Sequence, residues 1–202
     1  MKRSILLPLT IFFVWIGVIL WWTGGFRHFT SYSYAMYRAG TPPRNMPDLK
    51  MVDYDQKNID FNRWKGKYIL VDFMYLHCSS VCGILRSRLY DYQKELAPYL
   101  KKNLVMVSVS FDPQRDTTTI LKETWRSLGA EPNWIFASLK GTNEEIINEM
   151  YKFGIVIIKT PEGDFNHTTM HYLINPDGKL IKVIDPSSGK DKTLHEITKW
   201  IQ

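Results

Sequence analysis

The sequence has little cysteine and no concentration of charge of one sign. It holds 2 cysteines in 202 residues, so a thiolate site or a disulfide within the chain must use Cys78 and Cys82. The 26 lysines and arginines outnumber the 20 aspartates and glutamates, but they are scattered along the chain. Nucleic-acid binding requires a basic stripe, and its absence argues against nucleic acid as a partner. The chain also lacks internal repeats and low-complexity segments.

The two cysteines lie where an apolar run typical of a strand gives way to a pattern typical of a helix. One helical turn rises about 5.4 Å and returns side chains at i and i+4 to the same face, so Cys78 and Cys82 can share a metal ion or form a disulfide. A bridge over so short a loop removes little chain entropy, which argues against a purely structural disulfide. The helix dipole stabilises thiolates at a helix start, so we expect both sulfurs to be reactive.

The first 26 residues predict a membrane anchor. Lys2 and Arg3 precede an uncharged, mostly apolar stretch, Ser4–Phe26, which is long enough for a helix to cross a hydrocarbon core of about 30 Å. The basic residues favour a cytoplasmic N-terminus and an exported remainder. No small-x-small cleavage site follows, which argues against a signal peptide, and no Arg- and Ser-rich presequence is present. The sequence therefore predicts a bacterial inner-membrane protein with a periplasmic domain, in preference to a mitochondrial inner-membrane protein.

Three segments follow from this pattern: an anchor over 1–26, a tether over 27–48 that Pro42 and Pro43 interrupt, and one domain over 49–202. Strand-like and helix-like runs alternate in the domain, which predicts an α/β fold with a mixed sheet flanked by helices. The expected strands are Tyr68–Tyr75, Leu104–Phe111, Trp134–Leu139 (a strand or a turn segment), His167–Asn175 and Lys179–Asp185, with a hairpin in Leu49–Phe61. The expected helices are Val81–Leu100, Thr117–Leu128, Thr142–Phe153 and Thr193–Ile201.

Two thiolates favour Cu(I) or zinc, and an imidazole would complete a trigonal or distorted tetrahedral site. The chain has five histidines, at His28, His77, His167, His171 and His195. His77 adjoins Cys78, but consecutive residues at a strand end point to opposite sides, which makes it a neighbour of the site rather than a ligand. His167 stands where a loop enters a strand, and we favour it over His171, which is ~13 Å further along the same expected face.

Three motifs in this order resemble the Sco/SenC family. They are Cys78-x-x-x-Cys82 after one strand, Asp112-Pro-x-x-Asp116-Thr117 after the next, and His167-Thr-x-x-x-Tyr-Leu173-Ile-x-Pro-Asp-Gly178. The family consists of membrane-anchored, thioredoxin-fold copper chaperones and thiol-disulfide oxidoreductases that help assemble the dinuclear copper centre of cytochrome c oxidase. The resemblance covers roughly residues 47–201 and implies a thioredoxin-like fold here.

For this chain the resemblance implies that Cys78, Cys82 and His167 bind copper, as Cu(I) and also as Cu(II). It further implies that Asp112 and Asp116 line or brace the neighbouring loop, although turn and helix-cap roles also account for these aspartates.

Some positions depart from the family pattern. Ser79, Ser80 and Gly83 stand where the family usually has Pro, Asp and Pro, and His77 replaces a common Thr. The chain therefore lacks the carboxylate that the family usually has between its cysteines, and we expect this change to affect the metal preference more than the fold.

Three functions are compatible with these residues. The first is a membrane-anchored chaperone that delivers copper to the accepting subunit of a respiratory oxidase or to another cuproprotein. The second is an enzyme, a dithiol-disulfide couple that keeps the acceptor's cysteines reduced for metallation. The third is a structural or assembly subunit whose cysteines are a vestigial disulfide, for which the aromatic segment Phe29–Tyr37 would equally serve as a docking segment. Cu(I) binding that depends on His167 distinguishes the first, and a reduction potential in the physiological range distinguishes the second.

Overall fold

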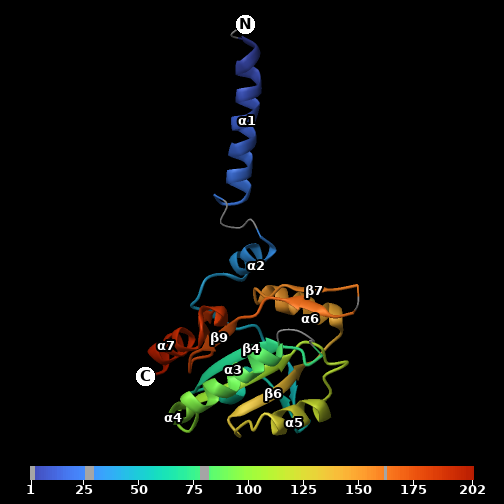
Figure 1. The fold of residues 1–202 in the computed structure, drawn as a ribbon, viewed down its shortest axis with the longest axis vertical. Coiled ribbons are helices and arrows are strands. Elements are labelled where there is room, and N and C mark those ends of the chain that lie inside the picture. The colour runs from blue at the N-terminus through green and yellow to red at the C-terminus, as the bar shows by residue number, and fades with distance from the viewer. Residues whose placement is uncertain (1–2, 26–29, 78–81, 162) are drawn as a thin grey trace.

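Helices and strands make up most of the chain from Arg44 onward (Figure 1). The computed structural model describes residues 3–25, 30–77, 82–161 and 163–202, without the side chains of residues 3–5 and 82–85. The helices are α1 (Arg3–Trp22), α2 (Ser31–Ala39), α3 (Cys82–Glu95), α4 (Ala97–Leu100), α5 (Thr118–Ser127), α6 (Asn143–Lys152) and α7 (Lys190–Ile201), with 3-10 helices η1 (Phe61–Trp64) and η2 (Pro186–Ser188). The strands are β1 (Arg44–Asn45), β2 (Met51–Asp53), β3 (Asn58–Ile59), β4 (Tyr68–Met74), β5 (Leu104–Ser110), β6 (Trp134–Leu139), β7 (Ile157–Lys159), β8 (Phe165–His167), β9 (His171–Ile174) and β10 (Lys179–Ile184).

A mixed sheet forms the centre of the fold. Within the described residues its strand order is β1-β10-β9-β4-β5-β6-β2-β3, while β7 pairs only with β8 in a separate two-stranded sheet. Strands β4, β5 and β6 are parallel, and β9 is antiparallel to β4. Parallel neighbours need a crossover connection, which α3 and α5 supply. The predicted mixed sheet with flanking helices is confirmed.

The central strands are apolar because both of their faces are covered. Every residue of β5 is buried, as is every residue of β4 after Tyr68. A strand buried on both faces reads as a continuous apolar run rather than as an alternation of apolar and polar residues. The runs predicted as strands at Tyr68–Tyr75 and Leu104–Phe111 are therefore confirmed to within one residue.

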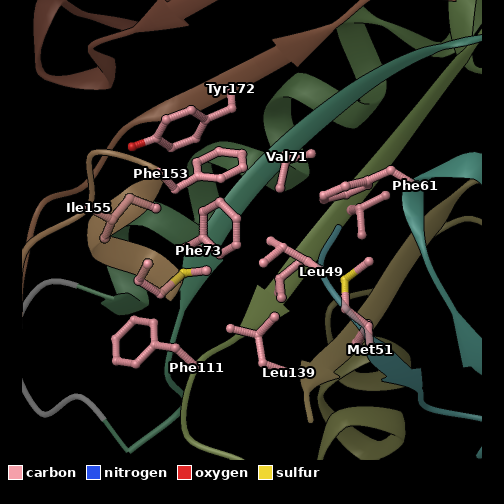
Figure 2. Packing of buried hydrophobic residues seen from close by; sticks show 14 of the residues in the cluster. Leu49, Met51, Phe61, Val71, Phe73, Phe111, Leu139, Phe153, Ile155 and Tyr172 are labelled. Carbon is pink, nitrogen blue, oxygen red and sulfur yellow. The ribbon is translucent and has the colours of Figure 1, made fainter. Parts of the chain in front are cut away.

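Two hydrophobic clusters pack on the two faces of the sheet. Helices α3, α5 and α7 contribute Leu89, Leu121 and Ile197 to one cluster. The opposite cluster includes aromatic side chains of β4 and β9 and that of Phe153, which directly follows α6 (Figure 2). There the Phe73 ring contacts the rings of Phe153 and Tyr172 edge to face, with centroids 5.3 and 5.6 Å apart. Such edge-to-face pairs stabilise the cluster beyond the area that they bury.

Two of the predicted helix starts are confirmed by their hydrogen bonds. The Thr117 hydroxyl accepts a hydrogen bond from the backbone N–H of Ile120, so Thr117 is the N-cap of α5. At α6, Thr142 and Glu145 form a reciprocal capping box. The helix predicted over Val81–Leu100 is divided: α3 ends at Glu95 and α4 begins at Ala97. Pro98 lies in the first turn of α4.

Helix α1 ends before the predicted apolar span does. Gly24 and Gly25 follow it with φ of 56° and 74°, conformations that glycine adopts without strain and that turn the chain out of the helix. In the part of the chain that the structure describes, no helix combines the length and the apolar character that crossing a bilayer requires. The membrane-spanning helix predicted over Ser4–Phe26 is therefore not supported.

The segment predicted as a tether contains a helix that packs on the domain. Thr30 and Ser33 form a capping box at the start of α2, and Ala35 is fully buried where α2 contacts α6. The chain then adds β1 to the sheet beside β10. Pro42 and Pro43 lie after this helix, and α2 packs against the domain through its contact with α6.

The strand predicted over His167–Asn175 is interrupted. His167 ends β8 and pairs with Ile157 of β7, whereas His171 begins β9 in the main sheet. Residues 168–170 separate the two strands, so the expectation that His167 and His171 share one face is wrong. This break matters for the candidate metal site because it places the two imidazoles in different surroundings.

Candidate metal centre

The carboxyl ends of β4 and β5 meet at one edge of the sheet, and Asp116 connects them. The two strands pair as far as Met74 and Ser110, so the residues that follow them emerge side by side. Oδ2 of the fully buried Asp116 accepts hydrogen bonds from the backbone N–H of Leu76 at 2.9 Å and from the Ser110 hydroxyl at 2.6 Å. Asp116 therefore braces the segment that leads to Cys78, the role that the resemblance implied.

His77 is attached to the same carboxylate. Its Nδ1 lies 3.2 Å from Oδ1 of Asp116, while the His77 side chain is 47% exposed. The contact fixes the residue that immediately precedes Cys78. It is compatible with the prediction that His77 is a neighbour of the site rather than a metal ligand.

His167 lies at this edge in an aromatic setting. Its ring contacts Phe111 and Tyr75 edge to face, with centroids 4.9 and 5.8 Å away. Nδ1 lies 3.0 Å from the carbonyl oxygen of Thr168, to which it can donate a hydrogen bond in the tautomer that leaves the Nε2 lone pair free. Burial lowers the pKa of His167, which favours the neutral, metal-binding form of the ring. A neutral ring with a free Nε2 lone pair is suited to bind a metal ion.

His171 is enclosed on the other face of the sheet. It is 2% exposed, and its ring lies edge to face with Tyr92 of α3 at 5.7 Å. Burial lowers the pKa of His171 to about 4. Within the described residues its Nδ1 has no hydrogen-bond partner. A side chain packed in this way cannot reach the sheet edge without opening the core, so the preference for His167 over His171 gains support.

The predicted sulfur ligands lie outside the described side chains. Cys78 falls outside the described residues, and of Cys82 only the backbone is described, as the first residue of α3. Among the side chains that the structure does describe, no three His, Cys, Asp or Glu residues come together as a metal site. The proposed ligand set of Cys78, Cys82 and His167 therefore stays a prediction, with His167 as its described member.

Sequence reasoning missed the aromatic and cationic residues around His167. Tyr75 and Phe111 were assigned to apolar strands, although the two-residue period of a strand places them on the face that carries Phe73. Arg115 lies inside the Asp112–Asp116 motif and was not singled out, yet it pairs with both Asp112 and Asp164.

A buried carboxyl in β4 was also missed. Asp72 accepts a hydrogen bond from the Ser108 hydroxyl at 2.6 Å, and Ser108 in turn accepts one from Nε1 of Trp134 at 2.9 Å. Burial raises the pKa of Asp72 to about 7. An acidic residue inside the apolar run Tyr68–Tyr75 was the sequence feature that could have indicated it.

Comparison with known sequences gives a consistent result. The sequence model of the SCO1/SenC family matches residues 39–202. The SCO1 protein homolog of Bacillus subtilis (strain 168) is 32% identical over 132 residues, which cover 63% of this chain and 67% of that protein. The mitochondrial protein SCO2 of Saccharomyces cerevisiae is 26% identical over 169 residues, 79% of this chain and 53% of that protein. The chain thus spans about half the length of the yeast relative.

Solved structures show the same fold. A SCO1/SenC family lipoprotein from Bacillus anthracis has a TM-score of 0.70 at 23% identity, covering 80% of this chain and 97% of that one. Arabidopsis thaliana ScoI with copper bound has a TM-score of 0.62 at 23% identity, covering 76% and 98%. BsSco, described as a Sco-family cytochrome c oxidase assembly protein with a disulfide switch, has a TM-score of 0.65 at 24% identity, covering 78% and 94%. The chain therefore has the mixed α/β, thioredoxin-like fold of these proteins.

Proposed function

This chain belongs to the SCO1/SenC family, and from that premise we propose that it binds copper as cargo and delivers it to the dinuclear copper centre of a respiratory oxidase. Cys78, Cys82 and His167 are the proposed ligands. The observation that carries the proposal is the His167 imidazole, whose Nδ1 is engaged by Thr168 and whose Nε2 has no hydrogen-bond partner among the described residues. The ring lies at the sheet edge from which the chain continues to the cysteines.

Chain length is compatible with this ligand set. The Tyr75 ring lies 5.8 Å from the His167 ring, and Cys78 follows Tyr75 by three residues. Three extended residues reach about 10 Å at most, so the length of the chain permits Cys78 to approach the imidazole. Cys82 opens α3, where the helix dipole favours a thiolate.

The donor types fit copper. Two thiolates and one imidazole are soft to borderline ligands, which suit Cu(I), and Cu(II) also accepts imidazole nitrogen. A site with three protein ligands leaves room for an incoming donor. We propose that the acceptor, a copper-binding subunit of a respiratory oxidase or another cuproprotein, takes the ion by exchanging these ligands one at a time.

Titration of the reduced full chain with Cu(I), in competition with a chromophoric chelator, tests this function. We expect one tightly bound copper per chain and loss of that binding in the double variant Cys78→Ser, Cys82→Ser. The variant His195→Ala, which removes an exposed histidine of α7, serves as the control and should bind as the wild type does. Stoichiometric binding that persists without both cysteines would exclude the proposed site.

A thiol-disulfide reductase is the second candidate, because both cysteines stand at or just before the start of α3. In this role one thiolate attacks a disulfide of the acceptor, and the second cysteine resolves the mixed disulfide, leaving the acceptor reduced and this pair oxidised. Reduction-potential measurement on the metal-free chain decides the matter. A potential at the reducing end of the range of thiol-disulfide oxidoreductases, about −270 to −180 mV, supports the role. A potential near that of a strong dithiol oxidant, about −120 mV, argues against it, and so does a pair that stays oxidised at every physiological redox poise.

We also propose that α1 attaches the domain to a membrane. Large apolar side chains such as Phe13, Trp15 and Trp21 are 65%, 67% and 85% exposed. An extended exposed apolar surface indicates contact with lipid or protein, and we assign it to the lipid of a bacterial inner membrane, with the domain in the periplasm. Fractionation should find the full chain in membranes that have been washed with high salt. Recovery of the intact chain in the soluble fraction would contradict this assignment.

A further inference from the structure

His167 is carried by a short hairpin that is separate from the main sheet. Strands β7 and β8 pair over three residues each, from Ile157 with His167 to Lys159 with Phe165 (Figure 1). A two-stranded sheet of this size has little stability of its own. Contacts with the rest of the domain must therefore hold the imidazole at the sheet edge.

Part of that attachment is aromatic. The Phe165 ring is buried and lies edge to face with Tyr75 and Phe111, at centroid distances of 5.5 Å in both cases. The Tyr75 hydroxyl donates a hydrogen bond to the Phe165 carbonyl oxygen at 3.0 Å and accepts one from its N–H at 3.4 Å. These contacts fix the start of β8, two residues before His167.

Arg115 supplies a second attachment, which is ionic and directional. Its Nη1 lies 3.2 Å from Oδ1 of Asp164, the residue that precedes β8, and its Nε donates to Asp112 on its own loop. The guanidinium carbon is 5.7 Å from the Tyr75 ring centroid and 5.4 Å from that of Phe165. A planar guanidinium can form fork-like hydrogen bonds and stack on rings at once, which lysine cannot do.

We propose that Arg115 is a positioning residue for copper binding: with Asp112 orienting it, Arg115 clamps the β7–β8 hairpin through Asp164 and Phe165 and so holds His167 within reach of the metal. The inference rests on the proposed function. The contacts of Arg115 with described residues are to Asp112, Asp164, Tyr75 and Phe165 rather than to His167, so it acts by keeping the third ligand in place. Loss of the clamp should let the hairpin detach more often and the copper leave sooner.

A double-mutant cycle on the reduced full chain tests the clamp. Cu(I) affinity is measured for the wild type, Arg115→Gln, His167→Ala and the double variant. The control is Arg63→Lys, at a half-exposed arginine that pairs with the buried Asp53. Arg115→Gln should weaken Cu(I) binding about 10-fold in the wild type, the lower end of the range for residues that support a ligand. It should have no further effect once His167 is alanine, because residues that act through one another are not additive.

Separate outcomes identify which idea fails. If His167→Ala leaves Cu(I) affinity unchanged, the proposed function is wrong. If His167→Ala weakens binding but Arg115→Gln has no effect, or has an equal effect in both backgrounds, the clamp is wrong.

Amide hydrogen exchange of the metal-free chain gives a readout that does not depend on copper. In Arg115→Gln and in the milder variant Asp164→Asn, the amides of β8 should exchange faster while those of β4 and β5 keep their wild-type rates. Unchanged exchange in β8 for both variants would overturn the proposal. Arg115→Lys should behave as Arg115→Gln does, because the fork and the ring stacking are lost even though the charge remains.

Discussion

Replacing His167 with alanine is expected to weaken Cu(I) binding by the full chain at least about 100-fold. Removing a group that only supports a metal ligand costs 10- to 100-fold in affinity, so removing one of three ligands should cost no less. The competition titration described for the wild type measures this change. The two cysteines remain in the variant, and residual binding through them is expected.

The control for this prediction uses the other buried histidine. His171→Gln keeps a polar side chain of similar size under α3, and it should leave Cu(I) affinity within a fewfold of the wild-type value. The opposite order of effects, with His171→Gln weakening copper binding more than His167→Ala, would show that the wrong imidazole has been assigned.

Replacing Asp72 with asparagine is expected to stabilise the metal-free chain progressively as the pH rises. Burial in β4 raises the pKa of Asp72 to about 7, whereas its ordinary value is 3.8. As the pH rises above 3.8 the unfolded chain loses this proton while the folded chain retains it, so the wild type loses stability until the pH passes 7. The difference in pKa predicts the size of this effect. Between pH 4 and pH 8, the free energy of unfolding of the variant should rise by about 4 kcal/mol relative to that of the wild type.

Urea unfolding of the reduced, metal-free chain at pH 4 to 8 measures this gain. Asp177→Asn is the matched control, because it makes the same change at an exposed position in the turn between β9 and β10, where asparagine is equally suited to the backbone. Its free energy of unfolding, measured at each pH beside that of the wild type, is the reference for an Asp-to-Asn change on the surface. If the free energy of unfolding of Asp72→Asn differs from that of the wild type by the same amount from pH 4 to 8, Asp72 is ionised in the folded chain over this range, which would contradict the prediction.

Local sequence patterns predicted most of the sheet and its helices. The apolar runs of β4 and β5 are typical of strands buried on both faces. Thr117, Thr142 and the Pro176-Asp177-Gly178 turn carry side chains that determine local backbone geometry. The cysteine pair and His167 lie in motifs at the ends of these elements, and as a ligand set they stay a prediction because the structure describes only the His167 side chain.

The features that sequence did not predict depend on contacts between distant segments. Helix α2 contacts α6, yet the residue that it buries is the small Ala35 rather than a large apolar side chain. The break between β8 and β9 arises because His167 pairs with Ile157 rather than with a strand of the main sheet. The role of Arg115 depends on Asp164, which is 49 residues away along the chain. Such pairings leave no trace in a local pattern.

X-ray absorption at the copper edge of the Cu(I)-loaded full chain measures most directly whether two sulfurs and one imidazole share the metal. The wild type and His195→Ala are predicted to show two sulfur ligands and one imidazole nitrogen, and His167→Ala is predicted to show the sulfurs alone. An imidazole contribution that persists undiminished in His167→Ala would contradict the proposed ligand set.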